Sequence, residues 1–451
     1  MRNVVLVTVD SLRADHVGSY GYRRDTTPVI DEFANDGLSF EAYANANWTR
    51  ASFPSVITST YPLEYGGFEY LADERITVGE AIQKSGHTTG AFHSNLWLSR
   101  DYNYNRGFDH FYDSKSDPSL LARLRTYLKL NLDHDGVVYR TLQRLYDTTE
   151  EKTGVDVGQT YKDAETITDE ALDWFHDVDE PFFCWIHYMD VHHPYIPHDD
   201  AAEKLGLDRD ILEREAIQLR RKMVEEPELI SDEEYQRLID LYDMEIRYTD
   251  TQIGRLKDAI NTQFGTNETA FIVTADHGEE FQEHGQFSHN AGMYDEVLSV
   301  PLVVSGDSIH PDGHQNELVE LLDIPPTCCD LAGAPVPDTY RGRSVLDAAG
   351  SGTDASVIAE TWNQDEYKLA LRTRQWKYIW DRHSGTTELY NLEYDPEEQN
   401  NVVREYSEIA ADLRDQLQAH LEEIRETNTD LPNIEMDSET EERLKNLGYL
   451  E

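Results

Sequence analysis

The chain has 451 residues, enough for one large α/β domain and a smaller appendage. Its 88 acidic residues outnumber 39 basic ones, and the net charge of −49 excludes nucleic acid and anionic membrane surfaces as partners. The acids are spread along otherwise periodic segments, a pattern typical of proteins from salt-in halophiles, because molar salt shortens the Debye length to about 3 Å and screens their repulsion.

The first apolar run begins at Asn3, and no apolar run reaches ~18 residues. We therefore expect neither a signal peptide nor a transmembrane segment. Three cysteines, Cys184, Cys328 and Cys329, do not make a disulfide framework and agree with a reducing interior. The sequence predicts a cytoplasmic protein and does not indicate its oligomeric state.

The first part of the chain, residues 1–115, alternates between strands and helices. Strands are predicted at 4–9, near Leu38–Tyr43 and at Ala91–Asn95, and helices around Pro28–Asp36, after Thr49 and over Gly79–Ser85. Residues 116–180 are charged, and we predict a mostly helical insertion followed by a crossover helix.

The polar stretch 199–262 is also predicted to be helical. Steps of three and four residues predict one buried face without chemistry, made of Tyr242, Ile246, Thr249, Ile253, Leu256 and Ile260. Further strands are predicted at 271–276 and Val300–Val304, and a helix within Gly313–Pro335 that has Pro325 and Pro326 in its first turn.

The pattern changes near Ser356. Three alternating segments predict an antiparallel sheet, and a helix over 404–425 and a tail over 426–451 follow; the segments are Tyr367–Thr373, Trp376–Arg382 and Thr387–Leu392. We therefore predict an α/β fold: a mostly parallel mixed sheet between helices over 1–350, and a small C-terminal antiparallel sheet with a helix over 351–451.

Three apolar, β-rich runs each end in an aspartate: VVLVTVD at Asp10, FFCWIHYMD at Asp190 and AFIVTAD at Asp276. Because ligands bind outside the carboxyl ends of parallel strands, we expect these acids at one edge of the sheet. Histidines follow two of them: His277, His192 and His193. Asp and His are ligands for Mg, Mn, Ca or Zn, so the pattern predicts a metal site. The alternative is that each aspartate caps a helix.

Two hydroxyl residues are candidates for the nucleophile that a metal-dependent hydrolase of a phosphate or sulfate ester would need beside its cation. Thr49 and Ser52 lie where a loop enters a predicted helix, beside backbone N–H groups that are able to hold an oxyanion. The alternative is plain N-capping by either residue.

Taken in order, several segments resemble the sulfatase branch of the alkaline phosphatase superfamily over nearly the full length. They are VTVDSLRADHVGSYGY, TTPVIDEFANDG, TRASFPSVITSTYPLEYGG, NYNRGFDHFYD, HYMDVHHPYIP, TADHGEEFQEHGQFSHNAGMYDEVLSVPLVV, LLDIPPTCCDLAGAPVPDTYRGRSVL, ALRTRQWKYIWD, ELYNLEYDPEEQNN and ERLKNLGYL. The resemblance implies an alkaline phosphatase-like fold and a metal-dependent hydrolase of a sulfate or phosphate (di)ester. The substrate would be a small molecule or a glycan or lipid ester.

Counted back from Tyr61-Pro62, the family's nucleophile position falls on Thr49. Ser52 is the alternative, because Ser52-Phe53-Pro54-Ser55 resembles the signature of true sulfatases, although Val56 stands where that signature has Arg. The choice matters: Cys or Ser is converted to formylglycine, the sulfatase nucleophile, whereas Thr is not.

Two further departures agree with Thr49. Ser11 stands where sulfatases usually have a second metal-binding Asp, and Ala91–Asn95 replaces a Lys-bearing segment. The remaining set of candidate residues resembles the one-metal sites of phosphonate and phosphodiester hydrolases and of glycerophosphate transferases. The resemblance implies one divalent ion (Mn, Mg, Ca or Zn) bound by Asp10, Thr49, Asp276 and His277.

His192 and His289 are candidates for the general acid and for binding the ester oxygens. Together with Asp190 they are alternatively ligands of a second ion, although the tight Asp190-Val191-His192 spacing favours one. Arg50, Asn95 and His193 are candidates for substrate binding. Two other functions stay open: transfer of the group to a sugar or lipid hydroxyl, and a non-catalytic binding protein on the same fold.

Overall fold

The structure is a computed structural model of the chain. It describes residues 2–115, 161–208, 211–266, 268–289, 292–306, 309, 313–348, 356–362, 367–427, 429 and 431. Residues 116–160 of the insertion and crossover predicted over 116–180 and the segment ERLKNLGYL of the predicted tail lie outside these residues.

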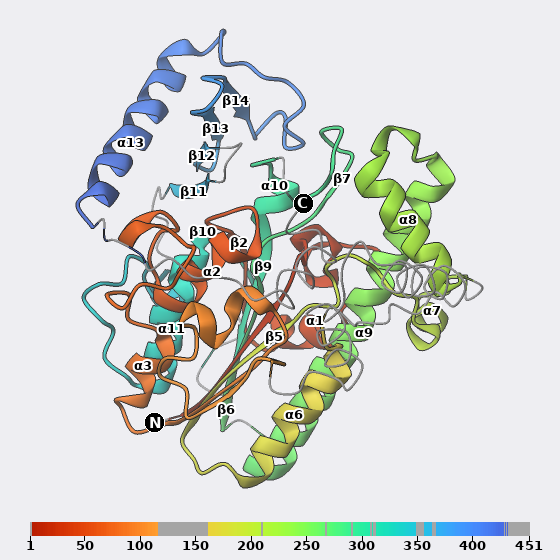
Figure 1. The fold of residues 1–451 in the computed structure, drawn as a ribbon, viewed down its shortest axis with the longest axis vertical. Coiled ribbons are helices and arrows are strands. Elements are labelled where there is room, and N and C mark those ends of the chain that lie inside the picture. The colour runs from red at the N-terminus through yellow and green to blue at the C-terminus, as the bar shows by residue number, and fades with distance from the viewer. Residues whose placement is uncertain are drawn as a thin grey trace, which may run out of the picture.

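An eight-stranded sheet forms the centre of the molecule, in the order β10-β2-β9-β6-β1-β5-β3-β4 (Figure 1). Only β9 runs antiparallel to its neighbours, β2 and β6, which confirms the predicted mostly parallel mixed sheet. The strands are β1 Asn3–Val9, β2 Leu38–Tyr43, β3 Thr88–Phe92, β4 His110–Tyr112, β5 Phe182–Tyr188, β6 Thr269–Ala275, β9 Ser299–Ser305 and β10 Gly313–Glu320.

The strands β1, β5, β6 and β9 are buried at every position, and for β1, β5 and β6 the unbroken apolar runs predict this. The third predicted strand is shifted: β3 ends at Phe92, and Asn95 caps a short 3₁₀ helix instead. The sequence patterns did not predict β4 and β10.

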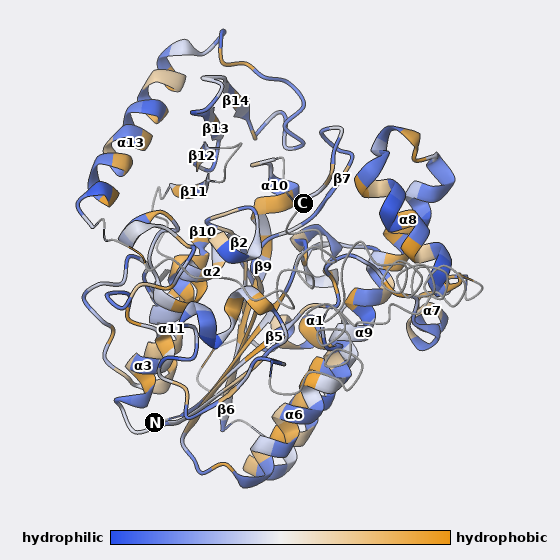
Figure 2. Ribbon diagram, viewed as in Figure 1, coloured by the Kyte–Doolittle hydropathy of each residue, from blue (hydrophilic) through white to orange (hydrophobic). Residues whose placement is uncertain are grey.

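Helices cover both faces of the sheet (Figure 1). On one face α9 packs against α1 and α6, and on the other α11 packs against α2 and α3. The bounds are α1 Pro28–Asn35, α2 Thr49–Thr58, α3 Val78–Gln83, α6 Ala164–Asp177, α9 Asp232–Phe264 and α11 Ile324–Ala332. The helices combine hydrophobic and hydrophilic residues (Figure 2), and hydrophobic residues such as Phe33 of α1 and Ile253 of α9 are buried.

The polar stretch predicted over 199–262 forms three helices, α7 Asp199–Leu205, α8 Glu213–Glu225 and α9. The predicted stripe of α9, from Tyr242 to Ile260, is buried throughout. Short elements complete the main body: β7 Glu280–Phe281, β8 Phe287–Ser288, α10 Asp295–Leu298 and α12 Val345–Ala348.

The C-terminal part contains the predicted antiparallel sheet and helix, at the top of Figure 1. Its elements are β11 Val357–Trp362, β12 Tyr367–Arg372, β13 Trp376–Asp381, β14 Thr387–Asn391 and α13 Ser407–Arg425. Leu369, Leu389 and Leu417 belong to its own core cluster. The boundary at 350/351 stays a prediction. In the described residues, no helix has the length and apolarity required to span a membrane.

Strand register positions the functional edge. Val9 of β1 pairs with Tyr188 of β5 and with Ala275 of β6, and Asp10 N donates to Tyr188 O at 2.8 Å. The next residues, Asp10 and Asp276, therefore leave neighbouring strands at the same level.

Candidate active site

Two buried carboxylates form the centre of the site. Asp10 and Asp276 are both 0% exposed. Ser11 Oγ donates to Asp10 Oδ1 at 2.9 Å, while Ser11 N and His277 N donate to Asp276 Oδ1 at 3.3 and 3.0 Å. Ser11 has the left-handed φ of 59°, a conformation uncommon for residues other than glycine, and Tyr242 Oη donates to its carbonyl at 2.6 Å. The backbone that follows the two strands thus orients both acids.

The two acids titrate in opposite directions. Burial and the charge of Asp10 raise the pKa of Asp276 to about 8. Burial also opposes ionisation of Asp10, but its contacts with His187, His192 and His277 hold its pKa below the usual range. Ionising both of two adjacent buried acids is unfavourable, so the pair favours a bound cation.

Thr49 lies against this pair. Its Oγ1 is 3.2 Å from Asp10 Oδ2 and 3.2 Å from His277 Nε2. His277 Nδ1 lies 2.8 Å from Gly278 O and donates to it, so the Nε2 lone pair faces Thr49. The structure thus brings Asp10, Thr49, Asp276 and His277 together, and their donor atoms suit a divalent ion.

Helix α2 begins at Thr49, and its first backbone bond runs from Ser52 N to Trp48 O at 2.9 Å. Its N-terminus therefore lies beside the nucleophile candidate, where the helix dipole favours negative charge. Ser52, one turn further on, has a different role: its Oγ donates to Asp276 O at 2.7 Å and fixes the helix to the end of β6.

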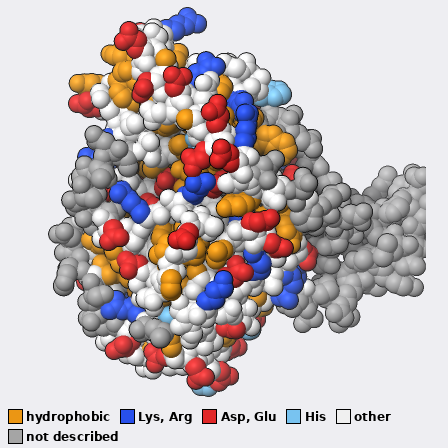
Figure 3. Space-filling view, turned by 90° about the vertical axis from the view of Figure 1, so that its left-hand side faces the viewer, with side chains coloured by type: hydrophobic (Ala, Val, Ile, Leu, Met, Phe, Trp, Pro, Cys, Tyr) orange, Lys and Arg blue, Asp and Glu red, His pale blue; other side chains and the backbone are white. Residues whose placement is uncertain are grey.

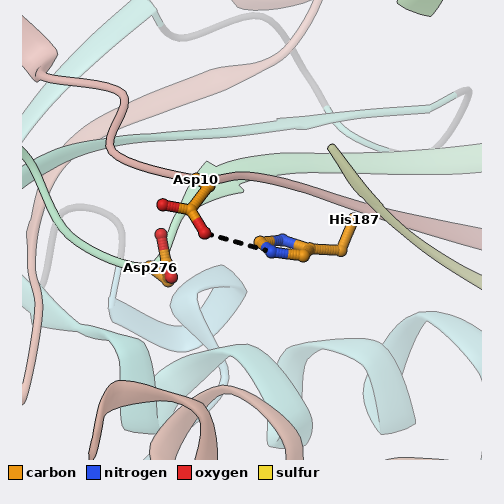
Figure 4. Close-up of side chains that lie close together, drawn as sticks. All are labelled: Asp10, His187 and Asp276. Atoms are coloured by element: carbon orange, nitrogen blue, oxygen red, sulfur yellow. Dashed lines mark ion pairs between the residues drawn. The ribbon is translucent and has the colours of Figure 1, made fainter. Parts of the chain in front are cut away.

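His187 joins the site although the sequence did not single it out. It belongs to β5 and is 0% exposed. Its Nε2 lies 3.4 Å from Asp10 Oδ2 (Figure 4). Its Nδ1 lies 3.0 Å from Thr8 Oγ1. Asp10, His187 and Asp276 each offer a ligand atom within 4.8 Å of the others. A histidine near the carboxyl end of an otherwise apolar strand was the signal that could have identified it.

Four imidazoles line the next part of the site. The ring centroid of His289 lies 4.4 Å from that of His277, 5.2 Å from His192 and 6.2 Å from His193. Burial lowers the pKa of His192 to about 3 and that of His277 to about 4.

His289 differs from them. Burial opposes its charge, but Glu279 lies 3.3 Å from its Nδ1 and raises its pKa above the usual value. Tyr195 Oη donates to the other Glu279 oxygen at 3.1 Å. His289 is therefore the imidazole best suited to hold a proton, and Glu279 is a residue that sequence reasoning missed.

Three predicted site residues make other contacts. Asp190 Oδ1 accepts from Ala164 N of α6 at 2.9 Å. Among the described residues, the ligand atoms of Asp190, His192 and His289 do not all lie within 4.8 Å of one another, as a shared ion would require. The Arg50 guanidinium lies 4.0 Å from the Trp97 ring centroid and donates to Glu69 O at 2.8 Å. Asn95 Oδ1 accepts from Trp97 N at 3.0 Å. Their functional roles stay predictions.

Known proteins resemble this chain in sequence and in fold. The family model described as Sulfatase matches residues 2–334, and one described as N-sulphoglucosamine sulphohydrolase, C-terminal, matches residues 282–427. An arylsulfatase of Clostridium perfringens is 25% identical over 468 residues, covering 95% of this chain and 96% of that protein.

Two solved structures share the fold. The protein BT4656, in complex with its substrate D-glucosamine-2-N,6-O-disulfate, has a TM-score of 0.72 at 17% identity, over 94% of this chain and 98% of its own. A phosphonate monoester hydrolase of Agrobacterium radiobacter has a TM-score of 0.66 at 17% identity, over 94% and 96%. Since the first family model spans most of the chain, the protein belongs to the sulfatase family, hydrolases of sulfuric or phosphoric esters with the alkaline phosphatase-like fold.

Proposed function

We propose that the protein is a metal-dependent hydrolase of a sulfate or phosphate ester, or of a phosphodiester, with Thr49 as its nucleophile. The position of Thr49 Oγ1, 3.2 Å from both Asp10 Oδ2 and His277 Nε2, carries this proposal. The Ser52 hydroxyl already donates to the carbonyl of Asp276, which supports Thr49 over Ser52.

The donor set supports one divalent ion held by Asp10, Asp276, His277 and the Thr49 hydroxyl. Carboxylate oxygen and imidazole nitrogen suit Mn or Zn, and oxygen alone suits Mg or Ca. Such an ion would lower the pKa of the Thr49 hydroxyl and offset the charge of the two acids and the ester. Asp190 makes its hydrogen bond to α6 instead, which favours one ion over two.

The residues then divide the reaction between them. Thr49 Oγ1 forms a bond to sulfur or phosphorus, its proton passes toward Asp10 Oδ2, and the bond to the leaving oxygen breaks. Protonated His289 donates to that oxygen, and His192 and His193 orient the ester oxygens. Water then attacks the Thr49 ester and gives a proton to His289; the bond to Thr49 Oγ1 breaks, sulfate or phosphate is released, and the proton held at Asp10 returns to Thr49 Oγ1 and restores the hydroxyl.

The substrate class follows from the same residues and the relatives. Threonine is not converted to formylglycine, which favours phosphate esters and diesters. Membership of the sulfatase family favours sulfate esters, and a sulfated sugar is the substrate of one structural neighbour. Among the described residues of the site, no contact favours a hydroxyl acceptor over water, so hydrolysis is proposed rather than transfer.

We further propose that the protein works in molar salt, as in a halophile. The net charge is −49, and acidic side chains are scattered over the face shown in Figure 3 rather than gathered in one block. Scattered charge of one sign keeps a protein hydrated, and its repulsion weakens once salt screens it.

The test compares Thr49→Ala with Ser52→Ala in molar KCl. Aryl sulfate, phosphate monoester, diester and phosphonate substrates are offered with Mn, Mg, Ca and Zn. We expect Thr49→Ala to lose at least about 1000-fold in kcat/KM on the best substrate, because the covalent route is removed. Ser52→Ala keeps most of its activity. Formylglycine at position 52 by mass spectrometry, or the opposite mutational result, would restore the sulfatase mechanism in place of this one.

A further inference from the structure

We infer that His187 is a ligand of the divalent ion, taking over the place of the second metal-binding aspartate that the family usually has at the position of Ser11. The inference rests on the proposed metal site at Asp10 and Asp276, and it adds an imidazole on β5 that neither the sequence motifs nor the family resemblance assigned. Ser11 itself offers only a neutral hydroxyl, which donates to Asp10 Oδ1 at 2.9 Å.

The geometry suits an ion between these groups. His187 Nε2 is 3.4 Å from Asp10 Oδ2, and His277 Nε2 is 3.7 Å from Asp10 Oδ1 and 3.5 Å from Asp276 Oδ2. Atoms bound at ~2.1 Å to a tetrahedral ion lie about 3.4 Å apart. In Figure 4 a ring nitrogen of His187 points at Asp10, and Asp276 lies just below that carboxylate.

The hydrogen bonds on the Nδ1 side of the His187 ring favour the tautomer whose Nε2 lone pair is free to bind a metal ion. Trp185 Nε1 donates to Thr8 Oγ1 at 3.1 Å, and Thr8 Oγ1 lies 3.3 Å from Ile186 O, to which it donates. With its only hydrogen so used, Thr8 Oγ1 accepts from His187 Nδ1 at 3.0 Å. The lone pair of His187 Nε2 then faces Asp10, and two acceptors face each other.

Burial makes this arrangement informative. His187 is 0% exposed, and its Nε2 makes no hydrogen bond of acceptable geometry in the described residues. A buried polar nitrogen without such a bond is destabilising, and a lone pair aimed at a carboxylate more so. A cation between the two removes both penalties. The opposite tautomer, with Nε2–H donating to Asp10, is the competing structure that the experiment must exclude.

Two imidazoles also change which ion the site prefers. Calcium and magnesium take oxygen ligands, whereas imidazole suits Zn and other transition ions. With His187 and His277 beside two carboxylates, we expect the site to bind Zn²⁺ and Mn²⁺ in preference to Ca²⁺ and Mg²⁺.

The test measures metal binding directly and needs no substrate. Full-length protein labelled with nitrogen-15 histidine is stripped with chelator and loaded with Mn²⁺ alone, and pulsed EPR counts the ligated imidazole nitrogens. We expect two in the unmodified protein, and one in each of His187→Gln and His277→Gln. Chelator competition should show that His187→Gln weakens Zn²⁺ binding by more than ~10–100-fold, the loss that is typical when a residue hydrogen-bonded to a metal ligand is removed.

The matched control is His93→Gln. His93 is equally 0% exposed, and its ring lies 5.1 Å from that of Trp185, but it contacts neither acid in the structure. Its loss should leave the nitrogen count and the Zn²⁺ affinity unchanged. Since the count in the unmodified protein is informative by itself, the test survives a variant that does not fold.

The outcomes separate the two proposals. One nitrogen in the unmodified protein, unchanged in His187→Gln, overturns the role of His187 even if esters are hydrolysed. Protein that binds no Mn²⁺ overturns it as well. Two nitrogens, one lost with His187, uphold the inference even if every ester of the panel is inert, a result that counts against the proposed function alone.

Discussion

Replacing Asp276 with Asn should stabilise the metal-free protein while removing its response to metal. The pKa of Asp276 is raised to about 8 by burial and by Asp10, against an ordinary 3.8. The folded state therefore holds the proton that the unfolded state releases, so stability is greatest below about pH 4 and is lost as the pH rises to about 8. Asn carries no such charge and still accepts from Ser11 N and His277 N.

The magnitude follows from the size of the shift. Carried by Asp276 alone, a rise from 3.8 to about 8 corresponds to roughly 6 kcal/mol at high pH. Asp10 shares the proton and its pKa moves the other way, so we expect about 2–4 kcal/mol from the pair. For 451 residues the entropy of unfolding converts this to a rise in Tm of about 2–4 °C.

The assay is thermal unfolding at about pH 8, with chelator and then with Mn²⁺. Metal at ~100 times its Kd should add ~2.7 kcal/mol to the unmodified protein and far less to Asp276→Asn. Asp250→Asn is the control: Asp250 is another buried acid whose pKa is raised, to about 7, and its carboxylate accepts from Val29 N and Ile30 N. It should keep the full metal response. A lower Tm for metal-free Asp276→Asn, at every pH, would refute the reasoning.

The remaining predictions concern the acid, its partner and salt. In His289→Ala, kcat/KM should fall little for nitrophenyl esters and strongly for alkyl esters, because a basic leaving oxygen needs the proton; equal losses on both would exclude His289 as the acid. In Glu279→Gln the pKa of His289 should fall, because Glu279 raises it, so the basic limb of the pH profile should move to lower pH; an unmoved limb would contradict this. Raising KCl from ~0.1 M to ~1 M shortens the Debye length from about 10 to 3 Å and should raise the Tm of a chain with net charge −49; a flat curve would contradict the salt-adaptation proposal.

Much of the fold could be predicted because local patterns determine it. The runs before Asp10, Asp190 and Asp276 are apolar at successive positions, as expected of strands that are buried on both faces. All three runs form adjacent central strands. The periodic face of α9 and the Pro-initiated α11 follow equally local rules. The short β4 was not predicted, because its three residues leave no period to read.

The sequence could not predict the register of the strands, on which the arrangement of the site depends. Asp190 ends its apolar run like the other two acids, but Tyr188 pairs with Val9, so Met189 is level with Asp10 and Asp190 is one residue further. Side chains alternate between the faces of a sheet, and Asp190 accordingly meets Ala164 of α6. No sequence pattern states a register between strands more than 170 residues apart.

The same alternation brings His187 into the site. His187 pairs with Thr8, two residues before Asp10, so both share a face with Asp10 and Asp276. That face receives the N-terminus of α2 with Thr49, whereas the opposite face receives α6 and α9, where Asp190 lies with Glu245. One sheet edge thus presents an acid–imidazole set to the nucleophile and a separate acid to a helix N-terminus. A slip of one residue between β1 and β5 would exchange these two roles, so the register of two buried strands decides which histidine can reach the metal-binding acids.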